Sequence, residues 1–102
     1  LTYARGEALS EEQFAYLRAE QGPGDPTRTA ADLVGAMHAA VDRALAQIRA
    51  TSPDALLEFR GVGRQQLPSN VLGLLFHAAE HTQRHTGQAI TTARIVRGLA
   101  DH

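Results

Sequence analysis

The sequence contains no cysteine, which excludes disulfide frameworks, thiolate nucleophiles, cysteine-type zinc sites and iron–sulfur clusters. It also lacks an excess of either charge, because ten Lys and Arg residues stand against eleven Asp and Glu, for a formal net charge of -1. This balance gives no general attraction to phosphate backbones or anionic lipids, so we expect neither a nucleic acid nor a membrane as a partner. Any metal chemistry of the chain must rest on its five histidines.

Long apolar runs are missing as well, since a charged residue or a glycine interrupts each one far short of the ~20 residues needed to cross a bilayer. The N-terminus shows no basic segment followed by an apolar core, so we expect a soluble, cytoplasmic chain. It also lacks an initiator Met, and we expect the sequence to begin inside a longer protein. With 102 residues, 43% of them hydrophobic, the composition is typical of one globular domain over residues 1–102.

The first predicted helix is short and begins at a capping box. Ser10 and Gln13 are three residues apart, so each side chain can satisfy the free backbone N–H of the other. We therefore expect a helix over residues 10–20. The following stretch, residues 21–26, is rich in Gly and Pro and predicts a loop.

A second capping box, Thr29 with Asp32, predicts a longer helix over residues 29–50. Pro53 stops this helix, because proline disfavours helical geometry in the residue before it. The apolar residues recur at spacings of three and four, which places them on one stripe of the helix. The stripe consists of Leu33, Met37, Val41, Ala44 and Ile48, widened by Val34 and Leu45.

Residues 54–67 show neither the three-to-four-residue spacing of a helix nor the alternation of a strand, and we interpret them as a partly ordered connection. Ser69 is the predicted N-cap of the longest helix, which should run to about Gly98, where glycine can end it. The predicted class is therefore all-α, with two long helices and a short one. A helix pair cannot enclose a core, so either preceding helices or a second chain must complete a bundle.

Three histidines spaced four apart, His77, His81 and His85, occupy the longest predicted helix. At about 100° per residue, His81 and His85 fall on the apolar side of the helix and His77 at its edge. Two imidazoles one turn apart can bind one cation, and such a pair forms half of a zinc-type site. The alternative that the spacing leaves open is two hydrogen-bonded core histidines. Glu80, between them in sequence, lies on the opposite, solvated side.

At least one further ligand is needed, because a catalytic divalent site usually takes three protein ligands and keeps one position open. His38 lies on the flank of the second helix, and His102 lies at the C-terminus; neither belongs to a ligand motif. Histidine suits zinc, nickel, iron and copper alike, and we expect zinc or nickel.

The run from Leu74 to Leu99, with the motif His77-x3-His81-x3-His85-Thr-Gly-Gln, resembles the last helix of the DinB-like superfamily. A weaker resemblance extends upstream to Thr29, so that about seventy residues of the C-terminal half of the family are covered. The resemblance implies an antiparallel four-helix bundle, of which this chain supplies two long helices and one short one. It also implies a divalent metal held by three histidines, and homodimers.

Carried over by position, the resemblance makes His81 and His85 the metal ligands of the last helix. It places His77 and Gln88 in the pocket or next to the ligands. Two departures are evident: Thr86 stands where the motif commonly carries Arg, and the family's third ligand has no counterpart in this sequence.

The function that the resemblance implies is a metal-dependent enzyme acting on a small molecule. It would be a thiol-dependent transferase or isomerase using a low-molecular-weight thiol, or a hydrolase. The alternative is a non-catalytic helical module for dimerisation or interaction, with an incomplete metal site.

Overall fold

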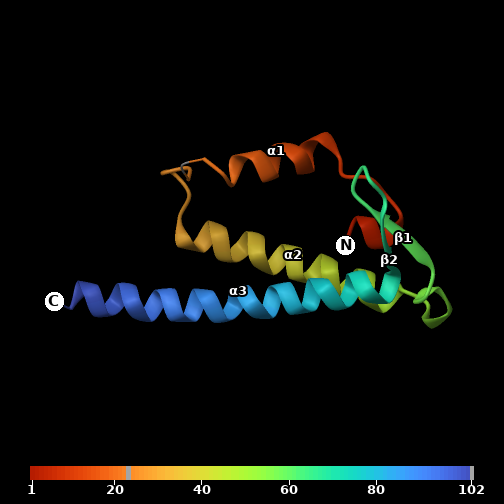
Figure 1. Ribbon diagram of the computed structural model, residues 1–102. Helices are drawn as coiled ribbons and strands as arrows, with labels where there is room; N and C mark the ends of the chain where they lie inside the picture. Colours follow the sequence, from red (N-terminus) through yellow and green to blue (C-terminus); the bar gives the residue numbers. More distant parts are fainter. Residues whose placement is uncertain (23, 102) are drawn as a thin grey trace.

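The computed structural model describes residues 1–22 and 24–101 and contains three α-helices and one β-hairpin (Figure 1). The two long helices run in opposite directions, and the hairpin and the N-terminus lie at the end where the first of them stops and the second begins. The C-terminal end of the last helix points away from this end. In chain order the elements are α1 (Glu11–Ala19), α2 (Ala30–Ala50), β1 (Phe59–Val62), β2 (Leu67–Asn70) and α3 (Val71–Ala100), with 3₁₀ turns at Tyr3–Arg5 and Pro53–Ala55.

Both predicted capping boxes are confirmed. The Ser10 hydroxyl accepts from the backbone N–H of Gln13 at 3.1 Å, and the Gln13 side chain accepts from the Ser10 N–H at 2.9 Å. At the start of α2, Thr29 and Asp32 exchange the same two bonds at 3.1 and 3.0 Å. These contacts join neighbours in sequence, and for this reason the starts of α1 and α2 fall where the sequence predicts them.

Replacing Thr29 with Ala is expected to destabilise α2 by about 1 kcal/mol, because it leaves a helix-end N–H without its acceptor. The Thr29 N–H and hydroxyl, together with the charge of Arg28, hold the pKa of Asp32 below its ordinary value of 3.8. Because the folded pKa is the lower one, the Asp32 contribution is present above pH 3.8 and is lost as the pH falls through the folded value. Circular dichroism during acid titration should therefore show a smaller loss of helix for an Asp32→Asn variant, which has no carboxylate to protonate, whereas identical curves would contradict the role of this carboxylate.

The all-α prediction is wrong, because the second half of the supposed connection and the residues directly after it form a two-stranded antiparallel sheet. Strands β1 and β2 pair with Phe59 opposite Asn70 and Val62 opposite Leu67. The turn between them contains Gly63 at φ 72° and Gln66 at φ 49°, two left-handed positions that reverse the chain. Each strand has only four residues and β2 includes a proline, so neither shows the alternation that would predict a strand.

The hairpin also moves the start of α3 by one residue. Ser69 is paired with Arg60 in the sheet, and Asn70 is the N-cap, accepting from the backbone N–H of Gly73 at 2.7 Å. At the other end, Gly98 does not stop the helix, which continues to Ala100.

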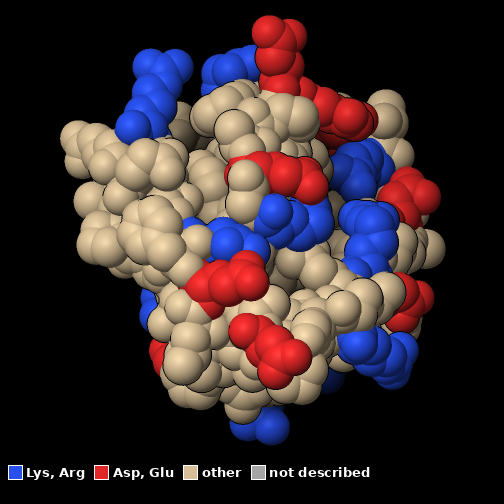
Figure 2. Space-filling view, turned by 90° about the vertical axis from the view of Figure 1, so that its right-hand side faces the viewer, with Lys and Arg blue, Asp and Glu red and all other residues tan. Residues whose placement is uncertain are grey.

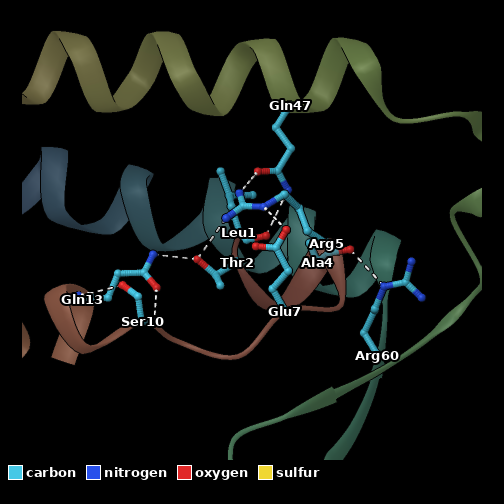
Figure 3. A network of polar contacts seen from close by, with 9 residues as sticks. All are labelled: Leu1, Thr2, Ala4, Arg5, Glu7, Ser10, Gln13, Gln47 and Arg60. Atoms are coloured by element: carbon cyan, nitrogen blue, oxygen red, sulfur yellow. Dashed lines mark hydrogen bonds and ion pairs between the residues drawn. The ribbon is translucent and has the colours of Figure 1, made fainter.

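The N-terminal turn is attached to the hairpin and to α2 by polar contacts between distant parts of the chain (Figure 3). The Arg60 Nε atom donates to the carbonyl of Ala4 at 3.0 Å, and Arg60 also forms an ion pair with Glu58 at 3.0 Å. On α2, the Gln47 side chain accepts from Arg5 at 2.6 Å and donates to the Leu1 carbonyl at 3.0 Å. The turn is thereby held over the junction between β2 and α3.

Replacing Arg60 with Met, which keeps the aliphatic stem, should loosen this turn. A hydrogen bond from a charged group contributes about 1.5–3 kcal/mol at partly buried positions, so cleavage after Arg5 by trypsin should become at least about fivefold faster. Arg64→Met is the matched control, because Arg64 is an exposed residue of the hairpin turn. Equal cleavage rates in both variants would show that Arg60 does not hold the turn.

The described part of the chain does not form the predicted bundle, because it contains three α-helices and very little core. Within the described residues, the buried apolar side chains are Ala4 and Val71, with exposed fractions of 5% and 3%. The radius of gyration is 16.7 Å, whereas a compact chain of this length has one of about 13 Å. The four-helix bundle is therefore a wrong description of the chain taken alone, because the apolar stripes of α2 and α3 lack the helices that would cover them.

The surface at the hairpin end shows Arg and acidic side chains interspersed with uncharged ones (Figure 2). No region of one sign dominates this face. Among the described residues, no helix is both long enough and apolar enough to cross a bilayer.

Candidate metal centre

Helix α3 places the three histidines of the motif in consecutive turns. The ring centroids of His77 and His81 are 5.9 Å apart with an interplanar angle of 33°. Those of His81 and His85 are 4.4 Å apart, with the rings at 73° to each other. A spacing of four residues on an α-helix gives this stacking of side chains, as the sequence predicts.

The two Nε2 atoms of His81 and His85 are 3.0 Å apart. Two nitrogens bound to one zinc ion at 2.0–2.1 Å lie about 3.3 Å apart at a tetrahedral angle and about 2.9 Å apart at a right angle. The observed separation lies between these two values. One divalent ion can thus contact both nitrogens with only small movements of the rings, provided that each neutral imidazole carries its proton on Nδ1.

Both imidazoles are exposed, which differs from the expectation that they point into a core. Every residue from Ala79 to Ala100 is exposed in the structure. The helical phase is as expected, but no other described element covers this part of α3. A cation can therefore reach the pair without displacing another described element.

The other predicted site residues add no ligand to the pair. His77 lies one turn before it, and Gln88 one turn after it, both exposed on α3. His38 is exposed on α2. His102 lies outside the described residues. Over residues 1–22 and 24–101, no group of three His, Cys, Asp or Glu side chains is close enough to hold a metal ion.

Thr86, where the motif departs from the family pattern, has its hydroxyl engaged with the backbone. It donates to the carbonyl of Thr82 at 2.8 Å, and Thr82 donates to the carbonyl of Ala78 in the same way. Such bonds to the preceding turn are common for helical threonines. Thr86 therefore does not provide the anion contact that an arginine at this position would offer.

A cavity of about 600 Å³ lies between the N-terminal segment, α1 and the hairpin, and the sequence gives no indication of it. Tyr3, Leu9 and Phe14 line it from one side, and Phe59 and Arg64 from the other. The two sides are more than forty residues apart in sequence, so only a prediction of the hairpin and of its docking to the N-terminus would have found the cavity.

The architecture and the site define the class of protein. It is a helical protein with two histidines one turn apart on its longest helix. The model of the DinB superfamily matches residues 1–89, which include α1, α2, the hairpin and all three histidines of the motif. The chain belongs to the DinB superfamily. The match begins at residue 1, whereas the resemblance found in the sequence reached upstream only to Thr29. The search found no match among curated proteins and none among solved structures.

Proposed function

We propose that this chain carries the histidine pair of a divalent-metal-dependent DinB enzyme that acts on a small molecule. The observation that carries the proposal is the 3.0 Å separation of the Nε2 atoms of His81 and His85. Membership of the DinB superfamily supports it, since the resemblance of the motif implies a metal held by histidines. Zinc and nickel are the expected ions, because both bind neutral imidazole.

In this proposal His81 and His85 bind the ion, and His77 and Gln88 lie beside the substrate. A divalent ion supplies Lewis acidity, which polarises a substrate or lowers the pKa of a thiol or a water molecule. The chain itself orients the two nitrogens, since both rings project from one rigid helix. The reaction would be transfer or isomerisation with a low-molecular-weight thiol, or hydrolysis. Residues 1–22 and 24–101 bring no third ligand to the pair, so the proposal requires a third ligand from elsewhere.

The metal-free protein provides the test. Titration with Zn²⁺ and with Ni²⁺, followed by isothermal calorimetry and elemental analysis after gel filtration, should give up to one ion per chain. Absence of bound metal at saturating concentrations of both ions would reject the proposal.

The second candidate function is a non-catalytic helical module for interaction. The exposed apolar side chains of α2 and α3 favour it, since Leu33, Met37, Ile95 and Leu99 are each more than half exposed. A stable assembly that takes up neither ion would support this function and contradict the metal enzyme.

A further inference from the structure

The cavity between the N-terminal segment, α1 and the hairpin is separate from the histidine pair. None of the described residues that line it belongs to α3, and the tip of the hairpin lies beside the segment that leads into α1 (Figure 1). Its volume of about 600 Å³ lies within the range of about 300–1,000 Å³ that is usual for sites that bind small molecules. The cavity is therefore large enough for a ligand of its own.

The aromatic residues of the chain are concentrated at this cavity. The chain has two tyrosines, three phenylalanines and no tryptophan, and three of these five rings line the cavity. They are Tyr3 of the N-terminal turn, Phe14 of α1 and Phe59 of β1. Tyr3 is half-buried, whereas Phe14 and Phe59 remain 42% and 62% exposed. A flat apolar group placed between these three elements would cover exposed aromatic surface and stack on it.

The charged side chains of the lining leave one positive charge without a partner. Glu7 is paired with Arg5 at 3.2 Å. Arg60 is paired with Glu58 at 3.0 Å. Within the described part of the chain these are the two ion pairs, so Arg64 has no acidic partner. An unpaired guanidinium binds a carboxylate through two parallel N–H bonds, and the cavity therefore offers a cationic group next to its aromatic surface.

The space beside Arg64 is open. Gly63, which also lines the cavity, has no side chain, and a Cβ built on it would meet no other atom within 4 Å. The neighbouring Gln66 side chain lies against Gly61 and donates to the Gly63 carbonyl at 3.0 Å, so it is held on the hairpin itself. A ligand can therefore approach the guanidinium without displacing a bonded side chain.

We propose that this cavity binds an aromatic carboxylic acid of one or two rings. The rings lie between Tyr3, Phe14 and Phe59, and the carboxylate accepts hydrogen bonds from the guanidinium of Arg64. A single unpaired arginine matches a single negative charge, and the Glu7 carboxylate on the lining opposes a dianion such as a phosphate monoester. The site shares no residue with the histidine pair, so the proposal does not depend on metal binding.

The probe for this site is 2-naphthoate, titrated into the metal-free, ¹⁵N-labelled chain in the presence of a chelator. We expect chemical-shift changes in the NMR spectrum at the backbone amides of Tyr3, Phe14, Phe59 and Arg64, with a dissociation constant of about 1 mM or lower. Shifts spread along α2 and α3 would mean attachment to exposed apolar side chains and would overturn the proposal. So would the absence of shifts at saturating concentrations of the probe.

Two further compounds test the recognition of charge. The first, 2-naphthamide, has the same rings without the charge and should bind at least tenfold more weakly than 2-naphthoate. The second, 2-naphthyl phosphate, carries a second negative charge and should also bind more weakly, because it faces Glu7. Equal affinities for 2-naphthoate and 2-naphthamide would overturn the role of the carboxylate.

Substitutions at the cavity test the assigned contacts. Arg64→Met should raise the dissociation constant of 2-naphthoate at least tenfold, and Arg64→Lys should raise it less, because lysine keeps the charge but not the paired N–H groups. Phe59→Ala should weaken binding of 2-naphthoate and 2-naphthamide alike. Arg43→Met is the matched control, since it removes an exposed arginine of α2 that does not line the cavity, and it should bind like the unmodified chain. Equal affinities of Arg64→Met and Arg43→Met would contradict the proposal.

Discussion

Replacing either His81 or His85 with Ala is expected to lower the affinity for Zn²⁺ or Ni²⁺ by about 100-fold or more. The reason is that the two Nε2 atoms lie 3.0 Å apart and are proposed to bind one ion together. Removing either histidine leaves a single ligand. Loss of a group that merely supports a ligand costs 10–100-fold in metal affinity, and loss of a ligand should cost at least as much. Calorimetric titration of each metal-free variant measures the effect.

His38→Ala is the matched control, because it removes an exposed imidazole from α2 and leaves α3 unchanged. It should bind metal as tightly as the unmodified chain. His77→Ala tests the predicted supporting position and should weaken binding by about tenfold, less than the loss of either ligand. If all three Ala variants lost affinity to the same extent, the binding would be non-specific attachment to imidazoles, and the assignment of the pair would be wrong.

Val71→Asp is expected to lower the free energy of unfolding by about 3 kcal/mol or more, because it places a carboxylate where only 3% of the side chain is exposed. Val71 is the first residue of α3, and its N–H donates to the carbonyl of Glu58 at 3.2 Å. Val71 also lines a small cavity together with Ala4 of the N-terminal turn and Ala50 at the end of α2. Thermal unfolding followed by circular dichroism measures the loss.

Ala79→Asp is the control for this substitution, since it adds the same charge to an exposed position of the same helix. It should lower the free energy of unfolding by no more than about 1 kcal/mol, which is the loss of helix propensity from Ala to Asp. Similar losses in the two variants would mean that the junction of hairpin and helix does not stabilise the chain more than any other part of α3.

Features that depend on neighbours in sequence were predicted correctly. The capping boxes at Ser10 and Thr29 and the end of α2 before Pro53 each involve residues within a few positions of one another. The stacking of His81 and His85 belongs to the same group, because the geometry of a helix alone determines it. The start of α3 was missed by one residue, since Ser69 and Asn70 are both good N-caps and only the sheet assigns Ser69 to a strand.

Features that depend on distant contacts were not predicted. The hairpin requires pairing between two strands of four residues, and its turn depends on left-handed positions, one of which is a glutamine. The docking of the N-terminal turn requires Arg60 to reach Ala4, 56 residues away. The surroundings of the histidines also fall in this group, because a periodic stripe shows which side chains share a face but not whether another element covers it.

The sequence by itself determined three helices, the caps of the first two, and the alignment of the histidines along one helix, and its histidine motif resembles the superfamily to which the chain belongs. The helices, the two caps and the alignment follow from spacing along the chain and from hydrogen bonds over three or four residues. Only the tertiary structure decided that Val71 and Ala4 are buried while the histidine pair is exposed, and that a hairpin joins α2 to α3. Burial and strand pairing depend on contacts between distant residues, and no local pattern in these 102 residues specifies those contacts.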